Sequence, residues 1–98
     1  MKVRYRTQAL ADIDQIYQYL EERSPSGALN VLRAIYAGSQ IIAEQPNASQ
    51  RTDDPEIRVK IVQRYRYKIF YSIIDNSTIE IVHVRHGSRR PWEGQSER

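Results

Sequence analysis

The sequence predicts an α+β domain in the order β-α-α-β-β-β, with a two-helix hairpin on one face of an antiparallel sheet. Residues 8–45 carry apolar side chains at helical spacing, interrupted once by a Ser-Pro pair. Residues 57–85 contain three runs rich in β-branched and aromatic residues, separated by short polar connections. Residues 2–6 alternate between apolar and basic side chains, which is typical of a short, half-buried strand.

The first predicted helix spans residues 8–23. Thr7 is its candidate N-cap, because a threonine hydroxyl can accept a hydrogen bond from an unpaired N–H of the first turn. Asp12 and Asp14 are two positions apart, so a helix places them on different faces. We therefore interpret both as solvated side chains rather than as a metal site.

The second predicted helix has the clearest local signals in the chain. Ser24 can cap it, and Pro25 suits its first position, where the N–H that proline lacks would be unpaired. The helix is expected to end near Gln45, because Pro46 disfavours helical geometry in the residue before it. We interpret Gly38 within this helix as a packing residue.

A polar loop is expected over residues 47–56, followed by three strands that form an antiparallel meander. The middle strand is the most apolar, so we expect it at the centre of the sheet with both faces largely covered. The sheet face opposite the helices carries several long polar side chains and is expected to form a groove. The expected strands are residues 57–62, 67–74 and 78–85, with a turn at 75–77.

The composition fits one small domain: 98 residues, of which 40% are hydrophobic and 28% charged. We expect residues 1–91 to form this domain and residues 92–98 a flexible C-terminal tail. No apolar run approaches the roughly 20 residues of a membrane-spanning helix, and no apolar leader follows Met1. We therefore expect a cytoplasmic protein without membrane contact. Without cysteine, and with only two histidines, we expect neither a metal nor a cofactor.

The net charge of +3 is unevenly distributed. Residues 57–98 carry nine basic and four acidic side chains, whereas residues 1–56 carry six basic and eight acidic ones. A basic sheet half suits a polyanion or an acidic protein partner. The alternative is a solvated face that keeps a small domain soluble.

The sequence lacks a glycine-rich phosphate loop, a nucleophile elbow and a cysteine–histidine pair. What remains is a set of cations interleaved with aromatic residues. Arginine binds phosphate through a planar fork, aromatic rings stack on bases, and histidine can move a proton near neutral pH. RNA cleavage needs only this combination, because the ribose 2′-hydroxyl is the nucleophile.

Several members of this set have a simpler interpretation as structural residues. Tyr67 and Tyr71 share a strand face with isoleucines and are interpreted as core. His83 follows Ile79 and Ile81 at a period of two and is interpreted as a half-buried strand residue. The candidate functional residues are Arg85, His86, Arg89 and Arg90.

Two segments, YKIFYSI at residues 67–73 and IVHVRHGSRR at residues 81–90, resemble the RelE/ParE superfamily of bacterial type II toxins. With the order of elements, the resemblance extends over residues 3–90. It implies the toxin component of a type II toxin–antitoxin system, held in a hetero-oligomer with a cognate antitoxin. The C-terminal segment of such an antitoxin wraps the toxin and covers its groove.

The superfamily has two activities, and the long helical hairpin with the Arg-His-Gly-Ser-Arg-Arg ending resembles the ParE branch, which inhibits DNA gyrase. This branch implies no catalytic residue. RelE-like members are ribosome-dependent endoribonucleases that cut mRNA, and a tyrosine is expected after Gly87 in them. Here Trp92 is the only aromatic residue after Gly87, and an indole cannot act as acid or base. A member that has lost toxicity is a third alternative.

The two activities imply different site residues. The predicted residues for target binding in a gyrase inhibitor are Arg85, His86, Arg89, Arg90 and Trp92. The predicted catalytic residues of the nuclease alternative are Arg58, Lys60, Lys68, His86 and Arg89.

Overall fold

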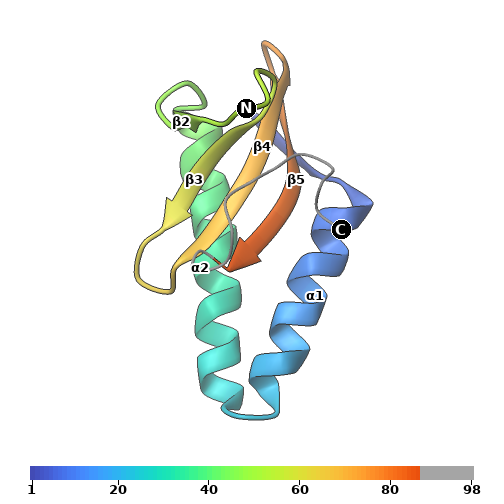
Figure 1. Ribbon diagram of the computed structural model, residues 1–98, viewed down its shortest axis with the longest axis vertical. Helices are drawn as coiled ribbons and strands as arrows, with labels where there is room; N and C mark the ends of the chain where they lie inside the picture. Colours follow the sequence, from blue (N-terminus) through green and yellow to red (C-terminus); the bar gives the residue numbers. More distant parts are fainter. Residues whose placement is uncertain (87–98) are drawn as a thin grey trace.

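The computed structural model describes residues 1–86, which form a five-stranded mixed sheet with two helices on one face (Figure 1). The strands lie in the order β1-β5-β4-β3-β2. The predicted fold class is confirmed. The elements are β1 (Lys2–Tyr5), α1 (Thr7–Glu21), α2 (Pro25–Glu44), β2 (Gln50–Arg51), β3 (Arg58–Val62), β4 (Tyr67–Asp75) and β5 (Thr78–His86).

The sheet differs from the predicted meander at its two edges. β1 pairs in parallel with β5, placing Tyr5 beside Ile81. Parallel strands need a long crossover, and here the strands and helices between β1 and β5 supply it. β2 is a two-residue edge strand beside β3, within the segment predicted as a loop, and so short a strand has no alternating pattern to detect. The pairing of β3, β4 and β5 is antiparallel, as predicted.

The N-terminal caps of the two helices follow the prediction in one case only. Ser24 Oγ accepts a hydrogen bond from the N–H of Gly27 at 3.1 Å, and Pro25 is the first residue of α2, as predicted. The prediction of Thr7 as a cap is wrong, because α1 begins one residue earlier than expected. Arg6 is the N-cap residue, and its carbonyl already accepts the first helical hydrogen bond from Leu10 N.

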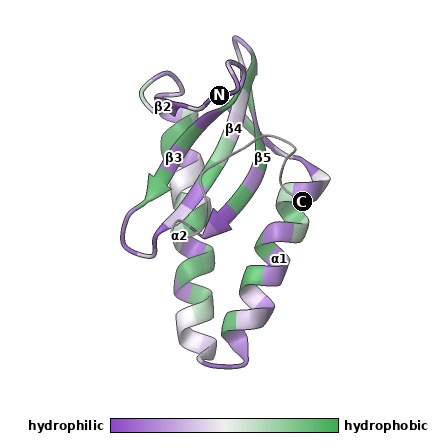
Figure 2. Ribbon diagram, in the orientation of Figure 1, coloured by the Kyte–Doolittle hydropathy of each residue, from purple (hydrophilic) through white to green (hydrophobic). Residues whose placement is uncertain are grey.

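The main core lies between the helices and the sheet, where hydrophobic segments of β3, β4 and β5 meet the apolar stripes of α1 and α2 (Figure 2). α2 approaches the sheet closely at Gly38. A Cβ added there would lie 3.0 Å from Ile69 Cδ1 and 3.3 Å from Val62 Cγ2, which confirms Gly38 as a packing residue. The largest fully buried hydrophobic side chains are Tyr71, Phe70, Ile35, Ile42, Ile69, Ile79 and Ile81.

The sheet face opposite the helices, which we call the far face, has an apolar centre. Phe70 of β4 lies on this face, while its neighbours Ile69 and Tyr71 belong to the core beneath the helices. β4 is therefore buried on both faces, as predicted. The polar groove expected on the far face is interrupted by this second cluster, which comprises Ile57, Val59, Phe70 and Val82.

Neither helix in the described part of the chain has the length and apolar character needed to cross a membrane. Residues 1–86 also contain no group of three acidic or histidine side chains close enough to hold a metal ion.

Candidate functional site

β5 contains a β-bulge at Val82. Tyr71 of β4 pairs with Ile81, but its neighbour Phe70 pairs with His83, so Val82 is an extra residue in β5. Side chains alternate between the two faces of a regular strand, and one extra residue reverses the order beyond it. The bulge therefore decides which face each residue from 83 to 86 occupies.

The consequence is a change in the surroundings of the basic end of β5. Ile81 faces the helices, and strict alternation would put His83 and Arg85 on the same side. Instead Val84 takes the buried position and is 3% exposed. Arg85 lies on the far face, directly across from Lys68 of β4. His83 is half-buried, as predicted, but on the face opposite to the one its spacing from Ile81 indicates.

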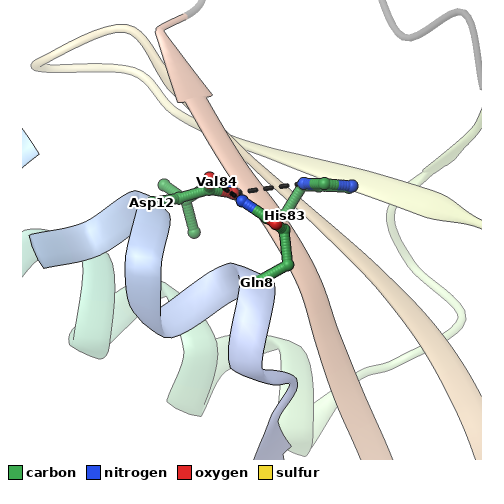
Figure 3. Close-up of polar contacts among 4 residues, drawn as sticks. All are labelled: Gln8, Asp12, His83 and Val84. Atoms are coloured by element: carbon green, nitrogen blue, oxygen red, sulfur yellow. Dashed lines mark hydrogen bonds and ion pairs between the residues drawn. The ribbon is translucent and has the colours of Figure 1, made fainter. Parts of the chain in front are cut away.

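Asp12 of α1 binds this bulged segment (Figure 3). Its Oδ2 accepts a hydrogen bond from the backbone N–H of Val84 at 3.0 Å and lies 3.2 Å from Nδ1 of His83. Gln8, one helical turn earlier, donates its Nε2 to Asp12 Oδ1 at 2.9 Å. The interpretation of Asp12 as a solvated residue is therefore wrong, since its side chain is only 16% exposed. Asp14 is exposed, as that interpretation expected.

The charge of Asp12 is stabilised by its donors. Burial raises the pKa of this carboxyl, but the hydrogen bonds from His83, Gln8 and the Val84 N–H outweigh it. The pKa of Asp12 therefore lies below its ordinary value. An ionised acceptor makes stronger hydrogen bonds than a neutral one, so this contact joins α1 firmly to β5.

The predicted catalytic cations are divided between the two sides of the sheet. Arg58 and Lys60 of β3 pair with the core residues Tyr71 and Ile69 of β4, and directly opposed side chains share a face. Arg58 and Lys60 therefore lie on the helix side, whereas Lys68 lies on the far face. The structure does not bring this predicted set together.

Two of these residues have structural contacts on the helix side. Arg58 Nη1 donates to the carbonyls of Ser49 at 2.9 Å and Asn47 at 3.3 Å, so it holds the segment that follows α2. The ring of His86 packs edge-on against Tyr67, with 5.2 Å between ring centroids. Of the residues predicted to bind a target, Arg85 and His86 point to opposite faces of β5 by register, but both contribute to the groove between α1 and the sheet. Arg89, Arg90 and Trp92 lie outside the described residues.

An open groove of about 900 Å³ lies between the C-terminal half of α1 and the sheet, where β4 begins and β5 ends. Its apolar lining comes from α1 and from the two strands, so distant parts of the sequence form it. Sequence reasoning missed this groove, and its only local signal is the apolar stripe of α1. The lining residues are Asp12, Gln15, Ile16, Tyr19, Leu20, Tyr67, Val84, Arg85 and His86.

The sequence of this chain matches a model of a toxin family. The family model described as "ParE toxin of type II toxin-antitoxin system, parDE" matches residues 3–91. No curated protein sequence matches the chain.

The solved structures that share the fold include the following three. A chain of the chromosomal ParDE system from P. aeruginosa has 19% identity and a TM-score of 0.76, over 88% of this chain and 95% of that chain. A chain of the RelBE2 toxin–antitoxin complex from Mycobacterium tuberculosis has 21% identity and a TM-score of 0.62, over 87% and 95%. The isolated E. coli RelE toxin has 14% identity and a TM-score of 0.55, over 91% and 86%.

Proposed function

Because this chain belongs to the ParE family of toxins of type II toxin–antitoxin systems, we propose that it inhibits DNA gyrase and that a cognate antitoxin neutralises it. Inhibition occurs by binding, and the toxin contributes no active site. The residues that bind the target include Arg85 on the far face, and the proposal adds Arg89, Arg90 and Trp92 from their sequence alone, since they lie outside the described residues.

The observation that carries this proposal is the division of the predicted catalytic cations. Cleavage of RNA requires a base, an acid and cations around one scissile phosphate. Arg58 and Lys60 lie on the helix side of the sheet and Lys68 on the far face, so they cannot surround one phosphate. Arg58 is in addition bonded to two backbone carbonyls. These contacts favour a binding inhibitor over a RelE-like nuclease.

One observation favours the nuclease alternative through a different residue. His83 lies on the far face, as do Lys68 and Arg85, and Asp12 orients its ring. A histidine oriented by a carboxylate is suited to act as a general base, and two cations stand on the same face. In this alternative His83 replaces His86 as the proton-transfer group.

Expression in cells distinguishes the two activities. A gyrase inhibitor induces the DNA-damage response and filamentation while mRNA stays intact. Codon-phased mRNA cleavage within minutes of induction, abolished by His83→Gln, would instead establish the nuclease. Asp14→Asn serves as a control in both assays, because Asp14 is exposed and makes its side-chain bond within α1, to Gln18.

The groove between α1 and β5 is the proposed docking site for the antitoxin segment. Its lining includes the apolar residues Ile16 and Leu20, and Tyr19 at its edge is 59% exposed. A partner that covers this surface removes apolar area from water, which is the main favourable term in protein association.

The docking site is tested by comparing two exposed apolar side chains. Tyr19→Ser is expected to weaken antitoxin binding about tenfold or more, in the range of a hot-spot residue. Leu29→Ser on α2, at a side chain that is 39% exposed and does not line the groove, is the control and is expected to leave the affinity unchanged. Equal affinities for the two variants would place the antitoxin elsewhere.

A further inference from the structure

We infer that Asp12 is a positioning residue: it selects the bulged register of β5 and thereby places Arg85 on the far face. The functional meaning of Arg85 rests on the proposed function. The structural part of the inference rests on the contacts between α1 and β5 alone.

The outer edge of β5 loses its neighbouring strand where β1 ends. β1 ends at Tyr5, opposite Ile81, and the N–H of Arg6 donates to the Ile81 carbonyl at 2.9 Å before α1 begins. Within residues 1–86 no strand pairs with the outer edge of β5 beyond this point, whereas β4 continues along its other edge. An N–H without a partner at a buried edge is costly. Asp12 Oδ2 bonds the N–H of Val84 there, in the position where a neighbouring strand would offer a carbonyl.

The contact between Asp12 and the Val84 N–H depends on the register of β5. Backbone groups of alternate residues point to the same edge of a strand, and Ile81 points to the outer edge because its carbonyl accepts from Arg6. In a strand without the bulge, the N–H of His83 would point outward next, and that of Val84 would point to β4. Asp12 bonds the N–H of Val84, so it recognises the bulged register.

The Asp12 carboxylate is held in one orientation by three donors. The two oxygens have different donors: Gln8 donates to Oδ1, while Val84 and His83 contact Oδ2. Gln8 lies on the same helix, so its bond to Oδ1 orients the carboxylate independently of the contacts to β5. A slip of β5 by one residue would lose both contacts to Oδ2 and turn Arg85 toward the helices.

Three variants of the full chain test the inference. Asp12→Ala removes the acceptor, whereas Asp12→Asn keeps an amide oxygen that can accept from the Val84 N–H. Asp14→Ala is the matched control, two residues along the same helix and bonded only within α1, to Gln18. The readouts are hydrogen exchange at the Val84 amide, the cross-strand nuclear Overhauser contact between Lys68 and Arg85, and inhibition of gyrase supercoiling.

Asp12→Ala is expected to accelerate exchange at Val84 about tenfold or more, to weaken the Lys68–Arg85 contact and to reduce inhibition by a similar factor. Asp12→Asn should change exchange and inhibition less than about threefold, because its amide oxygen restores the acceptor. A loss of overall stability alone would accelerate exchange at amides throughout the sheet, rather than selectively at Val84. The inference is overturned if Asp12→Ala keeps Val84 protected and the Lys68–Arg85 contact intact.

If Asp12→Ala does not fold, Gln8→Ala provides the test, because it leaves the carboxylate in place and removes only the bond that orients it. Faster exchange at Val84 than in Asp14→Ala supports the inference, and equal exchange contradicts it. Absence of gyrase inhibition by the wild-type toxin would overturn the proposed function, whereas exchange and the Lys68–Arg85 contact would still decide the role of Asp12.

Discussion

Asp12 Oδ2 lies 3.0 Å from the backbone nitrogen of Val84, so a carboxylate on α1 completes the outer edge of β5 where β1 has ended. The two residues are 72 positions apart. This hydrogen bond joins the first helix to the last described strand at the bulge where β5 changes faces. Its strength depends on the charge of Asp12, because an ionised acceptor makes the stronger hydrogen bond.

The contribution of Asp12 to stability is expected to disappear in acid. Its pKa in the folded protein lies below the ordinary value of 3.8, so the unfolded chain binds the proton more readily. The stabilisation is complete above pH 3.8 and decreases as the pH falls through the folded pKa. Urea unfolding should therefore show a difference between wild type and Asp12→Asn at pH 7 that shrinks below about pH 4. A difference that stays constant down to pH 2.5 would contradict this, with Asp14→Asn as the control.

The hydroxyl of Tyr71 ties the sheet to the segment after α2. The Tyr71 ring is fully buried, and its hydroxyl donates to the carbonyl of Pro46. Tyr71→Phe is expected to lower the free energy of unfolding by about 1 kcal/mol, because the carbonyl loses its donor while the ring still packs. Tyr19→Phe, at an exposed tyrosine, should change it by less than about 0.5 kcal/mol. Equal losses for the two variants would show that the Tyr71 hydrogen bond adds nothing.

Gly38 marks the closest approach of α2 to the sheet. Valine at this position would press its added atoms against Ile69 and Val62 and should lower the free energy of unfolding by about 1–3 kcal/mol. Ala37→Val on the exposed side of α2 changes only helix propensity, which costs less than about 1 kcal/mol. Thermal unfolding of both variants tests this packing. A Gly38→Val protein as stable as Ala37→Val would mean that the helix can move away at no cost.

Arg58 is predicted to act on stability rather than on toxicity. Its bonds to the carbonyls of Asn47 and Ser49 are charge-assisted, so Arg58→Met should lower the free energy of unfolding by about 1–2 kcal/mol. Hydrogen exchange should become faster over residues 47–52. Lys60→Met, on the same side of β3, is the control and should have a smaller effect. Loss of toxicity in Arg58→Met at unchanged stability would instead support a catalytic role.

The sequence predicted the parts of this fold that local interactions determine. Ser24 and Pro25 act within one turn of α2, so their roles could be assigned without knowing what the helix packs against. The central position of β4 could also be predicted, because burial of both faces leaves a nearly continuous apolar run.

Long-range pairing determines the parts that the sequence did not predict. The parallel position of β1 depends on contacts more than 70 residues away. The bulge at Val82 is invisible in a pattern that reads as regular alternation through His83. Asp12 was predicted to be solvated, because the spacing of residues within α1 does not show that His83 and Val84 of β5 are its partners. Arg58 and Lys68 were predicted to belong to one catalytic site. They lie on opposite faces of the sheet, which only the register of β3 against β4 shows.

The proposed binding of this toxin to gyrase is tested most directly by inhibition of purified gyrase in a supercoiling assay. The wild-type toxin is expected to stop supercoiling, the cognate antitoxin to restore it, and Arg85→Glu to reduce inhibition about tenfold or more, because it reverses a charge on the far face. Undiminished supercoiling at saturating toxin, together with cleavage of ribosome-bound mRNA by the same preparation, would contradict the claim.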